Sequence, residues 1–351
     1  MMDDNSNSNS TAPPLKLITR RKFLTASASA IALASIPLSR RLARADELPA
    51  LKFGGPTPNA KFYVTSYGST PDVDVNSWRF SIKGLVENAQ EFSYDDIRKM
   101  PAIEQPLTLE CISNPPDGTA ISNAIWKGVK LRPILERARV KQGAKFVAMR
   151  GADGYHTVLP VEELMRQENF LPYMMNGVPL PPDHGFPLRI FIPGKYGMKQ
   201  PKWITELEFA DHEIPGYWET RGWSDTAWRK VNSGFFSPKV EGGMMAFFDS
   251  KPKVSAPLDI YGWALAGPAG IKRVEVSTDD GATWRDAELV ENASPYVWTV
   301  WKIHLAPALP GVVTIRVRAT DGDGIKQPEK DPQTGAGMSG QARMGLEVTR
   351  V

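Results

Sequence analysis

The single cysteine of the chain, Cys111, is the side chain in this sequence best suited to bind a soft metal ion. Leu107 and Leu109 alternate before it, which predicts the end of a β-strand, and the Ser-Asn-Pro-Pro-Asp-Gly run after it predicts a polar loop. A strand end that opens into a loop presents a ligand well. One thiolate suffices if the metal arrives already chelated; the alternative is a buried structural thiol.

Several other kinds of site are excluded. With one cysteine the chain has no internal disulfide, no four-cysteine zinc site, no cysteine-ligated iron–sulfur cluster and no C-x-x-C-H haem attachment. The sequence also lacks H-E-x-x-H, G-x-S-x-G, a P-loop and G-x-G-x-x-G. Its four histidines have no zinc-type spacing.

A second candidate segment, residues 183–203, places cations among glycines and prolines. The cations are His184, Arg189, Lys195, Lys199 and Lys202. Arginine offers a bidentate fork to phosphate, and glycine permits close backbone approach to an anion. The segment therefore predicts a cradle for a phosphorylated organic cofactor, with a solvated basic loop as the alternative.

The elements around these segments predict an α+β body. Residues 78–85, 145–149 and 188–192 are short apolar runs typical of strands, and residues 94–99 and 131–138 have helical character. Loops of the length between them are usually functional.

After Pro238 the pattern changes to short strands without helices between them, which is typical of a β-sandwich. Asp279-Asp280-Gly281 predicts a hairpin turn. We place the domain boundary near Gly242-Gly243. The predicted strands are Leu258–Ala264, Lys272–Ser277, Trp298–Leu305 and Val312–Ala319.

The first 45 residues predict a secretory signal. A twin arginine, Arg20-Arg21, is followed by a Ser- and Ala-rich apolar stretch and by Ala43-Arg44-Ala45, a small-x-small cleavage pattern. We therefore expect export to the periplasm by the twin-arginine route. The segment carries a net charge of +5, so its removal changes the formal charge from +3 to −2. The basic balance thus gives no reason to expect a nucleic-acid partner.

Four motifs together resemble the sulfite oxidase family of molybdenum enzymes. They are the Cys111 segment, Trp126–Leu131, the stretch from Asn176 through Arg189, and Pro193–Trp203. Residues 260–264 and 276–284 resemble that family's immunoglobulin-like dimerisation domain. The resemblance implies a molybdopterin-binding α+β domain over residues 46–242 and an all-β immunoglobulin-like sandwich over residues 243–351.

The resemblance also implies roles for individual residues. Cys111 would be the protein ligand to molybdenum, beside molybdopterin. Tyr155 falls where sulfite oxidases carry an active-site tyrosine. The implied cofactor-binding residues are Cys111, Ser113, Asn114, His184, Arg189, Gln200 and Lys202.

The sequence departs from sulfite oxidases at their substrate cations. Pro115-Pro116 stands where they place an arginine, and Val64–Tyr67 stands where they have Arg-Asn-His. Because charge-assisted hydrogen bonds bind oxyanions, these losses should weaken binding of such a substrate. The loop from Lys195 to Lys199 instead resembles that of the periplasmic methionine-sulfoxide reductase catalytic subunit.

The resemblance therefore implies oxygen-atom transfer on a sulfur compound such as sulfite. The alternatives are reduction of a sulfoxide or other S- or N-oxide, and a non-enzymatic exported anion- or partner-binding protein. We expect molybdopterin with molybdenum as the cofactor, without haem or an iron–sulfur cluster. The expected partners are an external electron carrier (a c-type cytochrome or a membrane quinone-linked donor or acceptor) and a second copy of the chain in a homodimer.

Overall fold

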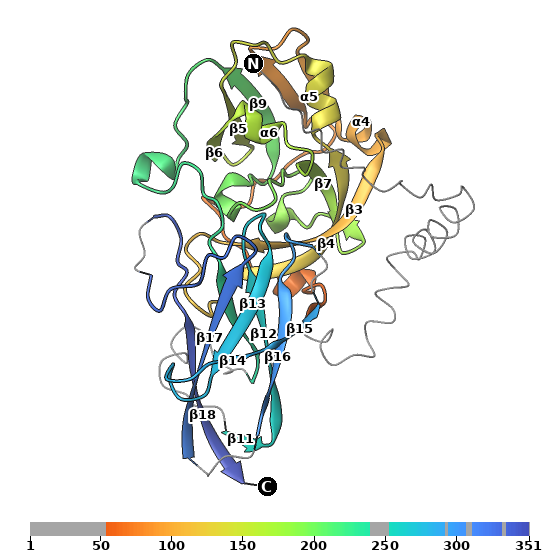
Figure 1. Ribbon diagram of the computed structural model, residues 1–351. Coiled ribbons are helices and arrows are strands. Elements are labelled where there is room, and N and C mark those ends of the chain that lie inside the picture. The colour runs from red at the N-terminus through yellow and green to blue at the C-terminus, as the bar shows by residue number, and fades with distance from the viewer. Residues whose placement is uncertain (1–53, 239–252, 292–293, 307–310, 332–334, 351) are drawn as a thin grey trace, which may run out of the picture. The chain divides into compact units, whose positions relative to one another are not determined.

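The structure is a computed structural model that describes residues 54–238, 253–291, 294–306, 311–331 and 335–350 (Figure 1). The predicted signal at residues 1–45 and the predicted boundary at residues 242–243 lie outside the described residues. None of the helices among the described residues is long and apolar enough to cross a membrane.

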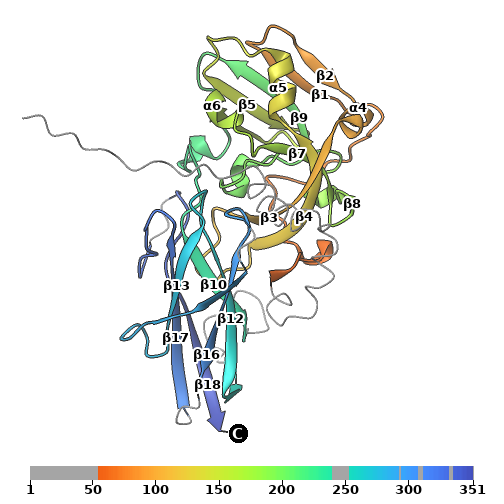
Figure 2. The same cartoon turned by 45° about the vertical axis from the view of Figure 1, so that its right-hand side comes forward.

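The first part of the described chain contains a five-stranded mixed sheet with the order β2-β1-β9-β5-β6 (Figures 1 and 2). β1 runs parallel to β9, and the other neighbouring strands are antiparallel. Alternate residues such as Phe80 and Ile82 of β1 are buried, as a half-covered strand requires. The strands are β1 Phe80–Gly84, β2 Gln90–Phe92, β5 Phe146–Gly151, β6 His156–Pro160 and β9 Ile204–Ala210.

A second, four-stranded antiparallel sheet has the order β3-β4-β7-β8. β3 and β4 are paired from Ala102 opposite Val129 to Glu110 opposite Ile121. The pairing therefore continues up to the residue before Cys111, which confirms that the thiol follows directly after a strand. The strands are β3 Ala102–Glu110, β4 Ile121–Lys130, β7 Phe170–Met175 and β8 Val178–Pro179.

Short helices connect the strands, as the sequence pattern predicts. α4 (Tyr94–Lys99) begins with a capping box, in which Ser93 and Asp96 satisfy each other's backbone N–H groups. α5 (Arg132–Ala138) buries Ile134, Leu135 and Ala138 in the main core of this part. Both predicted helices are confirmed, and a third, α6, spans Val161–Leu164.

The second part is a sandwich of two sheets, with the orders β10-β12-β16-β15 and β11-β18-β17-β13-β14 (Figure 2). Ile260, Trp301, Ile315 and Leu346 belong to the core between them. All four predicted strands are confirmed within a few residues. The strands are β10 Asn232–Ser237, β11 Lys253–Ala256, β12 Leu258–Leu265, β13 Ile271–Ser277, β14 Arg285–Asp286, β15 Glu288–Glu291, β16 Thr299–Leu305, β17 Gly311–Asp321 and β18 Ala342–Arg350.

Two local predictions need correction. Residues 188–192 are buried but form no strand, because apart from one bridge between Phe191 and Phe170 their backbone joins no ladder. β10, which the prediction left in the first domain, is paired with β12 and so belongs to the sandwich. This strand is important for the site because its residues contact the loop that carries Cys111.

Candidate active site

The backbone around Cys111 is held by hydrogen bonds at both ends of a loop. The Cys111 N–H donates to the carbonyl of Ala120 (2.9 Å), and the Asn114 N–H donates to the carbonyl of Cys111 (3.0 Å). We call residues 111–120 the Cys111 loop. The thiol is partly exposed, and its Sγ lies 3.2 Å from Oγ of Ser113. The sulfur is thus presented at the surface of a cavity.

Buried polar side chains hold the Cys111 loop in place through hydrogen bonds. Asn114 accepts a hydrogen bond from the Ala120 N–H on its Oδ1 and donates from Nδ2 to Glu110 Oε1 (3.1 Å). Glu110 also accepts from Asn232 Nδ2 (2.8 Å), and its Oε2 lies 3.5 Å from Arg229 Nε. Burial raises the pKa of Glu110, and Arg229 opposes that shift. Asn114 therefore positions the loop and does not line the cavity.

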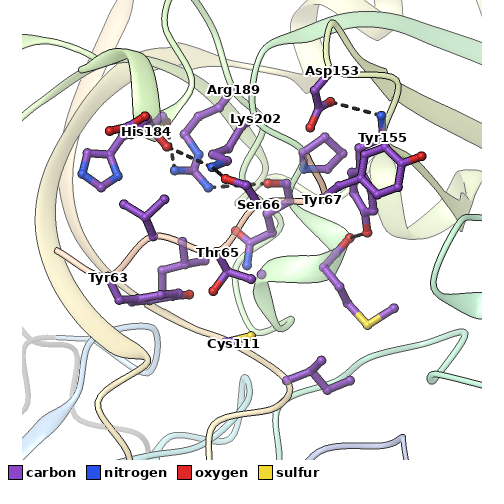
Figure 3. Close-up of a pocket in the computed structure, with 18 of the residues that line it drawn as sticks. Tyr63, Thr65, Ser66, Tyr67, Cys111, Asp153, Tyr155, His184, Arg189 and Lys202 are labelled. Carbon is purple, nitrogen blue, oxygen red and sulfur yellow. Dashed lines mark hydrogen bonds between the residues drawn. The ribbon is translucent and has the colours of Figure 1, made fainter. Parts of the chain in front are cut away.

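The cavity measures about 330 Å³ and collects most of the predicted site residues (Figure 3). They come from separate segments of the chain: the Cys111 loop, the turn before β6, and residues 183–202. Of the eight predicted residues, all but Asn114 line it: Cys111, Ser113, Tyr155, His184, Arg189, Gln200 and Lys202.

Arg189 is a buried cation that lacks a carboxylate partner among the described residues. Its Nη1 donates to the carbonyl of His184 (3.1 Å), while its Nε has no hydrogen-bond partner in the described part of the chain. Burial lowers the pKa of Arg189 to about 10. A buried, partly unsatisfied guanidinium is costly unless an anion compensates it.

Lys202 lies beside Arg189 and is also without an ion-pair partner in the described residues. Its Nζ donates to Ser66 Oγ (2.8 Å) and to the carbonyl of Asp183 (2.9 Å). Burial, reinforced by the charge of Arg189, lowers the pKa of Lys202 to about 8. Gly185, at φ +107°, allows the close approach, because a Cβ there would lie 3.2 Å from the Cβ atoms of both Arg189 and Lys202.

His184 and Gln200 line the same end, with their polar groups already engaged. His184 donates from Nε2 to the carbonyl of Asn59 (3.1 Å), and burial lowers its pKa. Gln200 donates from Nε2 to the carbonyl of Lys195 (2.7 Å) and accepts from the Ile192 N–H. Gln200 therefore shapes the loop through its side chain.

The other two lysines of the predicted cradle do not line the cavity. Lys195 Nζ lies 2.5 Å from Glu163 Oε2, and Lys199 pairs with Glu219. Both ammonium groups are buried and already neutralised by a carboxylate. Of the three lysines in the segment, only Lys202, the one to which the resemblance gives a cofactor-binding role, lines the cavity, because the other two face carboxylates on other segments.

Two of the three described tyrosines that line the cavity, Tyr63 and Tyr155, differ in their hydrogen bonding. Tyr155 donates its hydroxyl proton to the carbonyl of Met198 (2.6 Å), and burial raises its pKa. The hydroxyl of Tyr63 has no hydrogen-bond partner among the described residues, and burial raises the pKa of Tyr63 while the charge of Arg189 opposes the shift. The buried hydroxyl of Tyr63, unlike that of Tyr155, therefore has a proton free for a bound molecule.

The sequence prediction missed several lining residues. Thr65, Ser66 and Tyr67 line the cavity. They stand where sulfite oxidases have an Arg-Asn-His run, and this difference was the only indication of them in the sequence. Trp218 and Trp223 line the cavity from an aromatic stretch that the sequence analysis did not assign to the site.

The residues present fit a phosphorylated cofactor that brings its own metal ligands. Arg189 and Lys202 offer uncompensated positive charge at one side of the cavity, and Cys111 offers a thiol at another (Figure 3). The described residues contain no cluster of three or more His, Cys, Asp or Glu side chains that could hold a metal ion. A metal bound through Cys111 would therefore need further ligands from an organic chelate.

This fold and cavity define a cofactor-binding oxidoreductase domain followed by a β-sandwich. Comparison with known proteins gives the same class. Residues 67–218 match the family model described as the oxidoreductase molybdopterin binding domain, and residues 243–342 match the Mo-co oxidoreductase dimerisation domain. The chain belongs to the molybdopterin-dependent oxidoreductases of the sulfite oxidase family.

Individual relatives support this assignment. The chain is 29% identical over 314 residues to mitochondrial sulfite oxidase of Mus musculus, covering 78% of this chain and 57% of that protein. It is 33% identical to the uncharacterized oxidoreductase YuiH of Bacillus subtilis, covering 46% of this chain and 80% of that protein. The chain thus spans little more than half the length of the sulfite oxidase.

A solved structure gives the same fold. The sulfane dehydrogenase SoxCD from Paracoccus pantotrophus has a TM-score of 0.70 and 23% sequence identity, and the match covers 84% of this chain and 83% of that chain. The expected fold, a molybdopterin-binding α+β domain followed by an immunoglobulin-like sandwich, is thereby confirmed.

Proposed function

We propose that this chain is an exported molybdenum enzyme that transfers an oxygen atom to or from a sulfur compound. The observation that carries the proposal is that one cavity contains a partly exposed cysteine, the buried Arg189 and the partly buried Lys202, and neither cation has a carboxylate partner among the described residues. Mitochondrial sulfite oxidase is among the relatives, which supports sulfur as the reacting element.

Each lining residue has a defined task in this proposal. Cys111 would bind molybdenum through its Sγ, and Arg189 and Lys202 would hold the phosphate of molybdopterin. The bound cofactor would supply two-electron oxygen-atom chemistry. Tyr63 would donate its free hydroxyl proton in a hydrogen bond to a bound molecule, whereas Tyr155 would hold the Met198 backbone in place.

The N-terminal segment and the family membership support a cellular location, an electron partner and an oligomeric state for the enzyme. The twin-arginine segment supports export to the periplasm in a folded state. An external one-electron carrier, either a c-type cytochrome or a quinone-linked membrane protein, would exchange electrons with the cofactor. The match of residues 243–342 to a dimerisation domain supports a homodimer.

Metal analysis of purified protein tests the proposal. Protein from molybdenum-replete cells should contain about one molybdenum atom per chain, and Cys111→Ser should lose it while remaining folded. The wild type should also turn over a sulfur compound in one direction, with sulfite and cytochrome c or with a sulfoxide and reduced viologen. Metal-free wild-type protein would instead favour the non-enzymatic binding protein.

A further inference from the structure

An apolar wall borders the cysteine in the cavity. Ile112 follows Cys111 directly in the chain, and Ile112 and Met198 are buried in one cluster against which Trp218 and Trp223 pack. The rings of the two tryptophans meet edge to face, with centroids 5.9 Å apart. All four residues line the cavity, and we call them the aromatic wall.

The aromatic surface continues from this wall towards solvent. Trp218 contacts Tyr217 at 5.0 Å between centroids, and Tyr217 contacts Tyr67 at 4.4 Å. Tyr67 and Val64 line the cavity while remaining 45% and 51% exposed. Exposed large apolar side chains at the mouth of a cavity mark a place where an apolar ligand enters.

The positive charges of the cavity lie elsewhere. The only cationic or titratable basic side chains among its described lining residues are His184, Arg189 and Lys202. In Figure 3 these three lie together on the side of the view opposite Cys111, with Thr65 near the cysteine. They are the residues that the cofactor phosphate would use.

Three cations near the segments that form the aromatic wall are paired with carboxylates. Arg229 faces Glu110, Lys199 pairs with Glu219, and Lys230 Nζ lies 2.7 Å from Asp331 Oδ2. Arg221, which lies over the ring of Tyr217 at 3.6 Å, has no carboxylate partner among the described residues, but it does not line the cavity. An inorganic sulfur oxyanion placed beside Cys111 would therefore lose its hydration and contact apolar side chains. It would form no ion pair there with an unpaired cation of the cavity. That loss of hydration is unfavourable.

An uncharged organic substituent would gain from the same surroundings. Aromatic side chains bury apolar groups well and stack against rings. Tyr63, Thr65 and Ser113 supply neutral hydroxyl groups that are sufficient to orient a polar S=O group.

From these contacts we propose that the substrate is an uncharged organosulfur compound with an aromatic or extended apolar substituent, and that Trp218 and Trp223 bind this substituent. The proposal rests on the proposed function and specifies its substrate class. In the reductive direction, the S=O bond breaks, sulfur receives two electrons from two reduced one-electron carriers in succession, and the oxygen leaves as water after taking two protons. In the oxidative direction, water supplies the oxygen to a thioether and releases two protons, and two oxidised one-electron carriers accept the two electrons.

Steady-state kinetics of the molybdenum-loaded enzyme test the substrate class. Dimethyl sulfoxide and methyl phenyl sulfoxide are compared with reduced methyl viologen, and dimethyl sulfide, methyl phenyl sulfide and sulfite are compared with ferricyanide. In the direction that turns over, we expect kcat/KM for the phenyl compound to exceed that for the methyl compound by about tenfold or more. We also expect sulfite to be the poorer substrate.

Variants separate the wall's effect from the intrinsic reactivity of the compounds. Trp223→Ala should reduce the phenyl-to-methyl ratio to about threefold or less, mainly through KM, and Trp223→Phe should restore most of it. Trp284→Ala is the matched control, because Trp284 lies on the sandwich hairpin under Arg318 and does not line the cavity. Molybdenum content and unfolding temperature are measured for each variant.

The outcomes distinguish this inference from the function on which it rests. Efficient turnover of a sulfur compound with sulfite preferred, or with no phenyl advantage that depends on Trp223, would overturn the substrate class and leave the function standing. Molybdenum-free wild-type protein, or loaded protein inactive on every sulfur compound, would overturn the function itself.

Discussion

The cations that face the cavity lack a carboxylate partner among the described residues. Lys195, Lys199 and Lys202 are equivalent in the sequence, but Lys195 meets the partly buried Glu163 and Lys199 meets the buried Glu219. Arg189 and Lys202 meet no carboxylate among the described residues and face the cavity. An unpaired buried cation stores electrostatic cost that an anionic ligand removes on binding.

Replacing Arg189 should weaken cofactor retention. Arg189→Ala removes a charge-assisted contact worth about 1.5–3 kcal/mol, so cofactor affinity should fall by roughly tenfold or more. Molybdenum per chain after gel filtration measures the effect. Arg150→Ala is the control, since Arg150 pairs with Glu206 and Glu208 on the sheet. Full occupancy in Arg189→Ala would contradict the cradle.

Cofactor retention should also depend on pH through Lys202. The pKa of Lys202 without an anion is about 8, and a bound phosphate would raise it because it stabilises the charged form. The attraction is therefore complete below about pH 8 and diminishes as the pH rises above it.

Molybdenum released from the holoenzyme at pH 7 and pH 9 measures this dependence. We expect faster release at pH 9, and Lys202→Arg should flatten the profile because arginine stays charged. An unchanged profile in that variant would show that another group controls release.

At the level of elements, the end of β3 is fixed by contacts with the sandwich. Thr108 donates its backbone N–H to the carbonyl of Tyr296 (3.0 Å), Glu110 accepts from Asn232 of β10, and Asp117 Oδ1 accepts from the Phe235 N–H (2.7 Å). These contacts hold both sides of the Cys111 loop. The sandwich therefore takes part in positioning the thiol.

The buried pair of Glu110 and Arg229 should respond asymmetrically to substitution. Glu110→Leu leaves the guanidinium buried and unpaired and should destabilise the fold by about 3–5 kcal/mol. Adding Arg229→Met removes the stranded charge and should recover much of that loss. Urea unfolding midpoints measure both. A double variant no more stable than Glu110→Leu would show that the loss comes from packing or from Asn114 and Asn232.

For the whole molecule, the sandwich has two roles: it matches a dimerisation domain, and it contacts the strand that precedes Cys111. Residues 243–342 match a dimerisation domain, while β10 and residues 296–298 contact the strand that precedes Cys111. A dimer formed through this domain would also restrain the site.

We expect the purified enzyme to sediment as a dimer. Analytical ultracentrifugation should give twice the mass of the single chain, over a concentration range that includes the micromolar. A monomer throughout this range would refute dimerisation. Activity measured across the same range would show whether assembly affects the site.

The sequence alone predicted the class of fold and the chemistry of the cavity, because both depend on local patterns. Two-residue periodicity and hairpin turns indicated the sandwich, helical periodicity indicated residues 131–138, and one cysteine after a strand indicated a metal ligand. Family motifs in the correct order then implied molybdopterin. Residues 188–192 were misassigned because an apolar run predicts burial but does not specify the backbone's hydrogen-bond partners.

Only the tertiary structure decided which side chains share the cavity. Of the three lysines in the basic segment, only Lys202 faces the cavity. The other two are paired, because the fold brings Glu163 and Glu219 next to them. Tyr155, the tyrosine that the resemblance implied, donates its hydroxyl to the carbonyl of Met198, whereas Tyr63, which the sequence did not single out, has no such partner among the described residues. The residue types come from the sequence, but their charges and free protons depend on neighbours distant in the chain.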